Sequence, residues 1–350
     1  MFRLLYFVSI SIFFITCQQQ SKPISSPLNY QKLGGITMGV IPYNITYFDQ
    51  RNKALQPTID SLLDALNAGS STYEKMSTIS RFNASDSGIS IEKKGVDIHF
   101  INNILLAKKI VSATDGYFDP TVAPLVNYYG FGNKGKKGVT AIDSIKIKDL
   151  MKSVGFDKIQ IQQKGNQFLI TKKNKDTQLD FSAIAKGYAI DIVGKFLEGK
   201  NIQDYFIDIG GEIRAHGKSP RGDNWKTGIR DPLAPVGYRL DSVIVSLENR
   251  AMATSGNYEN FRIVQGKKIG HTMNPKSGFP EINNILSATV IAKECSVADS
   301  YATAFMAMGM EKAFNLAQNL PEIQAYLVYF DKNGIAVTKY TAGLEKFLIK

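Results

Sequence analysis

The chain has 350 residues, of which 44% are hydrophobic, so it is long enough for one large domain or two ordinary ones. Its net charge of +11 comes from 42 Lys and Arg against 31 Asp and Glu, and only nine of the basic residues are Arg. These residues are scattered along the whole chain, whereas nucleic-acid-binding proteins concentrate them on one face and favour Arg. The composition therefore argues against a dedicated DNA- or RNA-binding protein. It leaves general solubility, an anionic membrane surface or an anionic ligand as explanations of the charge.

The first 33 residues are predicted to be an export signal and a tether. Arg3 precedes thirteen mostly apolar residues, 4–16, which are fewer than the roughly 20 that span a bilayer but suit a signal peptide. The run ends at Cys17, before a Ser-, Pro- and Gln-rich stretch, and so resembles a bacterial lipoprotein signal. We expect a signal peptide over 1–16, a lipidated Cys17 and flexible tether over 17–33, and a folded domain over 34–350. Plain export and a retained anchor are the alternatives, because Phe14-Ile15-Thr16 departs from the usual residues before such a cysteine.

The folded part reads as helices interleaved with antiparallel strands. Apolar residues at helical spacing predict helices over 55–68, 100–113, 143–154, 183–199 and 298–318, the fourth with Ser182 as its N-cap. Strands are predicted over 44–49, 158–161, 168–171, 178–181, 205–213, 225–231, 241–247, 261–265, 325–330 and 335–338. Residues 69–83 read as a polar loop, and Gly210-Gly211 inside 205–213 indicates a bulge or a close approach to a ligand. Because no regular strand–helix–strand rhythm is present, the fold class is predicted to be α+β.

The stretch Leu179–Asp191 (LDFSAIAKGYAID) carries two residues that cost stability where they stand. Lys186 is predicted in a first helical turn, where the helix dipole disfavours a cation by roughly 0.3–1 kcal/mol. Gly187 is predicted inside the helix, where it is about 1 kcal/mol worse than Ala. A bound phosphate would explain both, because free amides and a Lys would converge on it and glycine allows a close approach. A solvated Lys beside a packing Gly is the alternative, and both remain open at this point.

Three further segments contain residues suited to chemistry. His271 lies in a polar turn, where functional groups collect, although a lone His is also often structural. Asp299 and Thr303 are four residues apart and share one helix face, where they could ligate a hard cation such as Mg²⁺. Asp299 as a simple helix N-cap is the alternative. The small hydroxyl residues of 252–258 suit the lining of a cleft.

Seven short motifs occur in order over residues 34–340. They are Thr37-Met38-Gly39, Asp115-Gly116-Tyr-Phe-Asp119-Pro-Thr121, Asp180-Phe-Ser-Ala-Ile-Ala-Lys186-Gly187-Tyr188-Ala, Asp208-Ile-Gly210-Gly211-Glu-Ile-Arg214, Ala253-Thr254-Ser255-Gly256-Asn-Tyr258, His271…Pro275-Lys-Ser-Gly278 and Ala298-Asp299…Ala302-Thr303. In this order the motifs resemble the ApbE family, the FAD:protein FMN transferases. The resemblance implies a single T-fold-like α+β domain, often a lipoprotein facing the periplasm.

The resemblance also implies an activity. Members bind FAD and Mg²⁺ and move FMN onto a Thr or Ser hydroxyl of a partner, releasing AMP. The usual partner is a flavoprotein subunit of a membrane redox complex. Two alternatives are an FAD pyrophosphatase, which uses water as the acceptor, and an exported flavin-binding lipoprotein without catalysis.

The family's site residues can be placed on this sequence. By resemblance, the FAD site is lined by Met38, Tyr73, Tyr117, Phe118, Asp119, Asp180, Lys186 and His271. The carbonyl of Ala183 and the side chains of Asp299 and Thr303 would hold the metal. The catalytic residues would be His271, as the general base, and Lys186. Tyr117 and Phe118 would offer stacking faces for a flavin or an adenine. Val40 and Asn274 depart from the family pattern, in which Thr and Asp are usual.

Overall fold

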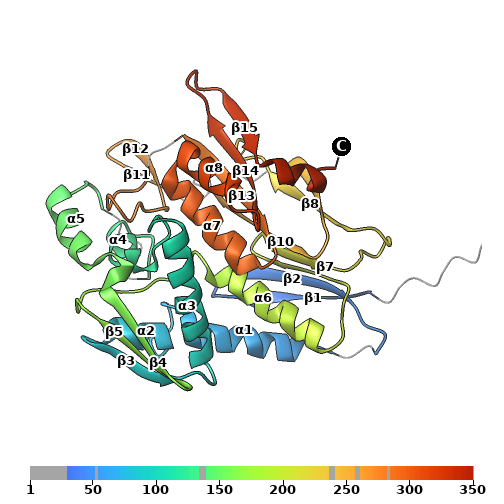
Figure 1. Ribbon diagram of the computed structural model, residues 1–350, viewed down its shortest axis with the longest axis horizontal. Helices are drawn as coiled ribbons and strands as arrows, with labels where there is room; N and C mark the ends of the chain where they lie inside the picture. The colour runs from blue at the N-terminus through green and yellow to red at the C-terminus, as the bar shows by residue number, and fades with distance from the viewer. Residues whose placement is uncertain are drawn as a thin grey trace, which may run out of the picture.

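An eight-stranded sheet forms the centre of the computed structural model, which describes residues 30–51, 54–133, 139–235, 241–256, 261–281 and 284–349 (Figure 1). The strand order is β1-β2-β6-β7-β10-β13-β14-β15, and every neighbouring pair is antiparallel. The bounds are β1 Tyr30–Thr37, β2 Ile41–Phe48, β6 Tyr205–Ile209, β7 Glu212–His216, β10 Arg250–Gly256, β13 Ile285–Ala292, β14 Gln324–Phe330 and β15 Ala336–Tyr340.

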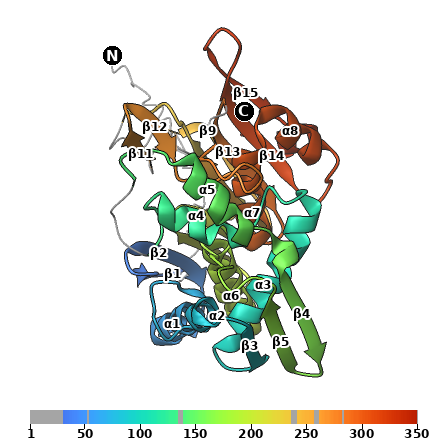
Figure 2. The same cartoon turned by 90° about the vertical axis from the view of Figure 1, so that its left-hand side faces the viewer.

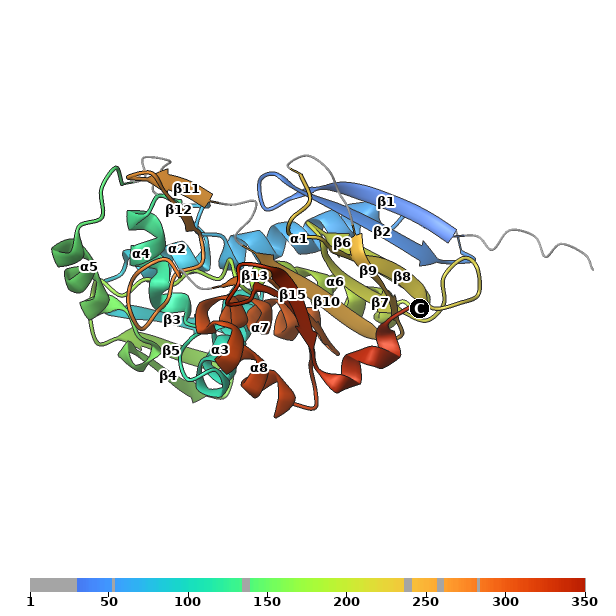
Figure 3. The ribbon, with the colours of Figure 1, turned by 90° about the horizontal axis from the view of Figure 1, so that it is seen from above.

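Helices cover one face of this sheet (Figures 1 and 3). They are α1 (Gln56–Ser70), α6 (Ala185–Gly199), α7 (Cys295–Met308) and α8 (Met310–Gln318), with α3 (Asp97–Ala113) packed against α1 and α7. Helix α6 buries Ala189, Val193 and Leu197, which recur every four residues and so form one apolar stripe. The other face of the sheet is covered by β8 (Trp225–Arg230), β9 (Asp241–Leu247) and the 3₁₀ helix η4 (Ala342–Phe347).

A smaller three-stranded sheet lies beside α2 and α3 (Figure 2). Its order is β3-β5-β4, with bounds β3 Gly88–Glu92, β5 Gln167–Lys172 and β4 Ile159–Lys164. The remaining elements are α2 (Thr78–Ala84), α4 (Ala123–Tyr128), α5 (Ser144–Leu150), the hairpin of β11 (Phe261–Val264) and β12 (Lys267–Gly270), and the 3₁₀ helices η1 (Pro120–Val122), η2 (Met151–Ser153) and η3 (Phe156–Lys158). Mixed helices and antiparallel sheets confirm the α+β class.

The folded part begins earlier than the sequence predicted. Strand β1 starts at Tyr30, because the register of β1 and β2 extends from Thr37↔Ile41 back to Tyr30↔Phe48. The Tyr30 hydroxyl also donates a hydrogen bond to the Lys218 carbonyl at 2.8 Å. Residues 30–33 therefore belong to the sheet and not to a tether. The signal segment, Cys17 and the rest of the predicted tether lie outside the described residues, and no helix within the described ranges is long and apolar enough to cross a membrane.

Two glycine positions divide elements that were predicted to be continuous. Gly210 and Gly211 both have positive φ, at 63° and 98°, and form the two-residue turn of the β6–β7 hairpin. Two-residue hairpin turns with positive φ at both positions favour glycine, so the predicted strand over 205–213 with a bulge was wrong. Gly309, with φ 78°, separates α7 from α8 within the region predicted as one helix over 298–318.

Two segments before α6 differ from their predictions. Helix α2 occupies the end of the predicted loop 69–83 and extends one residue beyond it, and it is capped by Ser77, whose Oγ accepts from the Ser80 amide at 3.2 Å. The predicted strand over 178–181 is absent, because the side chain of Asn83, and not a neighbouring strand, satisfies the backbone groups of Leu179. Asn83 Nδ2 donates to the Leu179 carbonyl at 2.8 Å, and Asn83 Oδ1 accepts from the Leu179 backbone amide at 2.7 Å.

Candidate active site

Lys186 lies in the first turn of α6, as predicted, but Ser182 does not cap this helix. The N-cap position is held by Ile184, which makes no side-chain capping bond, and α6 begins at Ala185. The Ser182 amide instead donates to Asp180 Oδ1 at 2.8 Å. The capping prediction failed because Asp180 closes a tight local turn just before the helix and draws the serine backbone into it.

The ammonium of Lys186 forms an ion pair with the carboxylate of Glu212, the first residue of β7. The Glu212 side chain is only 4% exposed, whereas that of Lys186 is 27% exposed. Burial raises the pKa of Glu212 to about 7, although the charge of Lys186 opposes the shift. Lys186 is therefore not a simple solvated side chain. No pattern in the sequence indicated Glu212 as the partner of Lys186, although this residue directly follows the double glycine of one motif.

Gly187 and Asp299 join the first turn of α6 to α7. A Cβ on Gly187 would lie 2.6 Å from the carbonyl carbon of Cys295 and 2.7 Å from the Cα of Ser296, so Gly187 packs against the start of α7. The Gly187 amide donates to Asp299 Oδ2 at 3.1 Å. Asp299 is 3% exposed and stands inside α7, whose N-cap is Glu294, so the helix-cap alternative was wrong. Burial raises the pKa of Asp299, while Lys186 and the Gly187 amide lower it.

The contact at Gly187 gives a prediction about stability. Replacing Gly with Ala inside an ordinary helix stabilises it by about 1 kcal/mol. At Gly187 we expect the opposite sign, a loss of about 1–3 kcal/mol, because the new methyl group would overpack the α6–α7 contact. Urea unfolding of Gly187→Ala measures this, with Gly199→Ala as the control, since a Cβ there meets nothing within 4 Å. Equal stability of the wild type and Gly187→Ala would show that the α6–α7 contact accommodates the added methyl group without a loss of stability.

Asp191 holds α6 and α7 together behind this contact. Its Oδ1 accepts from the Cys295 amide at 2.9 Å and from Arg214 Nη1 at 2.9 Å, and its Oδ2 accepts from the Ser296 amide at 2.9 Å and from Ser296 Oγ at 2.7 Å. A carboxylate at a helix N-terminus also complements the helix dipole. Asp191 therefore fixes the spacing between the turn that carries Lys186 and the helix that carries Asp299. The sequence offered no signal for this role beyond an acidic residue in a helix.

The residues predicted to hold a metal have suitable donor atoms. Asp299 contributes a carboxylate, Thr303 a hydroxyl one helical turn later, and Ala183 a backbone carbonyl just before α6. Thr303 Oγ1 lies 3.2 Å from Ser255 Oγ on β10, which places this part of the hydroxyl-rich segment 252–258 next to α7. Carboxylate, hydroxyl and carbonyl oxygens are the ligands of hard cations such as Mg²⁺, so the donor chemistry fits. Within the described part of the chain, no group of three or more His, Cys, Asp or Glu side chains is arranged to hold a metal.

The aromatic motif at 117–119 is divided between the surface and the core. Phe118 is 3% exposed and packs in the main apolar core, so the prediction that its ring offers a stacking face was wrong. Asp119 is buried, and its two oxygens accept from the Thr121 amide and hydroxyl and from the Phe156 amide. Tyr117 is half-buried between two lysines, with Lys276 Nζ at 4.8 Å and Lys312 Nζ at 5.0 Å from its ring centroid. Of the two aromatic residues, Tyr117 has the accessible ring and Phe118 does not.

The remaining predicted FAD residues lie at turns and loops. Tyr73 is 72% exposed, and partial desolvation, with the charge of Asp180 as the smaller cause, raises its pKa. Met38, with φ 49°, occupies the turn between β1 and β2 and packs against the apolar cluster that contains Tyr188 of α6. The structure thus packs Met38 against the cluster that contains α6 and leaves Tyr73 largely exposed.

His271 directly follows β12. Its ring is half-buried and stands 6.3 Å from the ring of Phe131 in an edge-on arrangement. Asn274, which departs from the family pattern, donates to Glu281 Oε2 at 2.7 Å and accepts from the Lys276 amide at 2.9 Å. The amide of Asn274 therefore stabilises its own turn.

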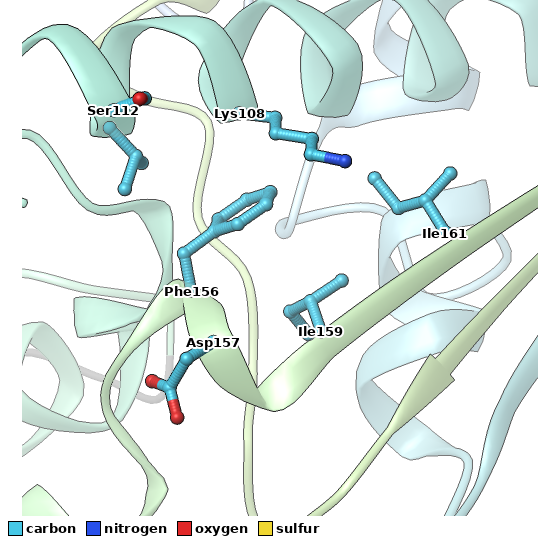
Figure 4. Close-up of a pocket in the computed structure, with 7 residues that line it drawn as sticks. Lys108, Ser112, Phe156, Asp157, Ile159 and Ile161 are labelled. Carbon is cyan, nitrogen blue, oxygen red and sulfur yellow. The ribbon is translucent and has the colours of Figure 1, made fainter.

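The hollow drawn in Figure 4 lies away from Lys186. It has a volume of about 300 Å³ and an apolar floor of Phe156, Ile159 and Ile161, with Lys108 on α3 at its edge. An adjoining hollow of about 490 Å³ reaches Asp115, Asp119 and Lys276. The second hollow therefore touches the predicted FAD residues only at Asp119.

Comparisons with known proteins identify the family of this chain. The sequence profile of the ApbE family matches residues 38–327. The FAD:protein FMN transferase of Haemophilus influenzae is 32% identical over 345 residues, which cover 97% of this chain and 95% of that protein. The solved flavin transferase ApbE from Vibrio cholerae superposes with a TM-score of 0.80 at 31% identity, over 92% of this chain and all of that one. The apo flavinyl transferase ApbE of Pseudomonas stutzeri gives 0.78 at 31% identity, over 91% and 96%. The chain therefore belongs to the ApbE family.

Proposed function

We propose that this chain transfers FMN from FAD to a Thr or Ser hydroxyl of a protein acceptor and releases AMP, in a Mg²⁺-dependent reaction. The observation that carries the proposal is the convergence of Lys186 and Asp299 at the packed start of α6 and α7. Relatives that are FAD:protein FMN transferases match nearly the whole chain, which supports the same activity here.

The chain's own residues suit the chemical step. Breaking a pyrophosphate requires neutralised charge and an attacking oxygen in line with the leaving group, and little covalent work by the protein. The Lys186 ammonium would bind phosphate oxygens. The amides of Ala185, Gly187 and Tyr188 at the start of α6 already donate to Phe181, Asp299 and Ile184. Asp299, Thr303 and the Ala183 carbonyl would hold Mg²⁺, which when bound supplies Lewis-acid neutralisation of the phosphates. His271 would accept the proton of the acceptor hydroxyl as its oxygen bonds to the FMN phosphorus and AMP leaves.

One incubation separates this proposal from its alternatives. The purified domain is mixed with FAD and Mg²⁺, with and without a flavoprotein acceptor. A fluorescent acceptor band that survives denaturation, together with AMP, is the expected result. Free FMN plus AMP with or without the acceptor would identify an FAD pyrophosphatase, and intact FAD would leave a binding protein.

We further propose that the protein is exported and lipid-anchored through Cys17, facing the periplasm, where it meets a flavoprotein subunit of a membrane redox complex. The short apolar run before Cys17 supports this location. Cys17→Ser is expected to move the protein from the membrane fraction to a soluble exported or unprocessed form, while the purified domain keeps its activity. Fractionation with an antibody measures this, and an unchanged membrane fraction would count against lipidation.

A further inference from the structure

Glu212 holds Lys186 at a place where the lysine side chain is still accessible. The carboxylate accepts a hydrogen bond from Lys186 Nζ through Oε1. Its side chain is almost fully buried, whereas more than a quarter of the Lys186 side chain is exposed. An ammonium has three donors, so a lysine that gives one to Glu212 keeps two for other acceptors. The pair is therefore anchored at its glutamate end and open at its lysine end.

The position of Glu212 is fixed by the β6–β7 hairpin. Glu212 forms the closing pair of the hairpin with Ile209, next to the Gly210-Gly211 turn. The turn lies over the ion pair, because a Cβ on Gly210 would be 3.7 Å from Lys186 Cδ and 3.8 Å from Glu212 Oε2. The same Cβ would lie 2.7 Å from Ile41 Cγ2, which leaves the turn little room for another side chain. A rigid backbone thus sets the place of this carboxylate.

The charges around Lys186 are unbalanced. Glu212 and Asp299 are both buried carboxylates, and both are attracted to this one ammonium. The second oxygen of Glu212, Oε2, is buried and has no hydrogen-bond partner within the described residues. A buried carboxylate with an unsatisfied oxygen is costly to keep, so its retention at this place needs a reason.

We propose that Glu212 is a positioning residue of the FMN transfer reaction, which fixes the Lys186 ammonium so that its remaining donors face the pyrophosphate of FAD. The inference rests on the proposed function. Fixed orientation lowers the barrier of the chemical step. A carboxylate close to an anionic substrate, in contrast, does not favour its binding in the ground state. Loss of the Glu212 charge is therefore expected to lower kcat without weakening FAD binding, which separates positioning from uniform binding.

A double-mutant cycle of Glu212→Gln and Lys186→Met tests whether Glu212 acts through Lys186. The readout is the rate of AMP release from FAD, which transfer and hydrolysis share, together with the FAD dissociation constant. In the wild-type background, Glu212→Gln is expected to lower kcat about tenfold with equal or tighter FAD binding. In the Lys186→Met background, the same change should alter kcat less than about twofold. Glu248→Gln is the matched control, because Glu248 pairs with Lys218 at 3.8 Å and both side chains are exposed.

Three results would overturn the inference. These are an unchanged kcat in Glu212→Gln, an equal loss in both backgrounds, and a loss of FAD affinity that parallels the loss of kcat. If Glu212→Gln does not fold, Glu212→Asp replaces it in the cycle, since it keeps the charge and withdraws the carboxylate by one methylene. The double variant removes both partners and so avoids an unpaired buried charge. Absence of AMP release by the wild type would contradict the proposed function as well, whereas an active wild type with an independent Glu212 contradicts only this inference.

Discussion

Asp299→Ala is expected to lower the rate of AMP release from FAD by about 100-fold or more and to raise the Mg²⁺ concentration needed for half-maximal activity. Asp299 is the one carboxylate among the three predicted metal ligands, so its loss removes the charge that would hold the cation. A bound metal supplies several kcal/mol of transition-state charge stabilisation, and 100-fold corresponds to about 2.7 kcal/mol. The measurement is a Mg²⁺ titration of AMP release for the wild type and the variant.

Asp299→Asn tests whether the Asp299 carboxylate binds the metal or only supports the contact between α6 and α7. Its amide oxygen can still accept the hydrogen bond that the Gly187 amide gives to Asp299 Oδ2. The α6–α7 contact should therefore survive in Asp299→Asn, with a melting temperature near that of the wild type, while the Mg²⁺ requirement still rises. Asp149→Ala, which removes an exposed carboxylate paired with Lys152 at 3.1 Å, is the control for a simple loss of charge. Normal turnover of FAD by Asp299→Asn at low Mg²⁺ would show that the carboxylate only supports the helix contact.

The sequence predicted well the parts of the fold that depend on short-range patterns. The strands of the β14–β15 and β4–β5 pairs lie close to their predicted ranges, because each pair is adjacent in the chain and is joined by turn residues, Asn333-Gly334 and Gly165-Asn166. Helix α6 was also found from its apolar stripe, since Ala189, Val193 and Leu197 mark one face whatever packs against it.

The errors arose where a distant partner decides the local structure. Leu179 was predicted to be in a strand, but the side chain of Asn83, 96 residues earlier, satisfies its backbone groups. Phe118 was assigned to a stacking surface because it adjoins Tyr117, and only the packed core shows that its ring is buried. The partners of Lys186 were hidden for the same reason, since Glu212 and Asp299 reach it from other elements. Spacing along one segment cannot show which other segment faces it.

Lys186→Met is expected to weaken FAD binding or turnover by tenfold or more, about 1.4 kcal/mol, if the ammonium meets the phosphates of FAD. From the helix dipole alone, loss of the charge should leave the FAD-free domain equally stable or slightly more stable. The ion pair with Glu212 changes that expectation. Removing one partner of a buried pair leaves an uncompensated charge and costs about 3–5 kcal/mol. We therefore expect Lys186→Met to be less stable than the wild type without FAD.

The size of this loss should depend on pH, and its sign follows from Glu212. Burial already raises the pKa of Glu212 to about 7, above its ordinary value of 4.5, and removal of Lys186 takes away the charge that lowers it. An acid whose pKa is higher in the folded than in the unfolded state destabilises the fold progressively as pH rises from the unfolded toward the folded pKa. The free energy of unfolding of Lys186→Met should thus be close to that of the wild type at pH 5 and clearly lower at pH 8 to 9. Urea unfolding at both pH values measures this, and adding Glu212→Gln to Lys186→Met should restore much of the stability at high pH. If Lys186→Met is as stable as the wild type at pH 9, the ion pair with Glu212 does not hold Lys186. If FAD affinity and turnover are also unchanged, Lys186 does not contact the phosphates of FAD.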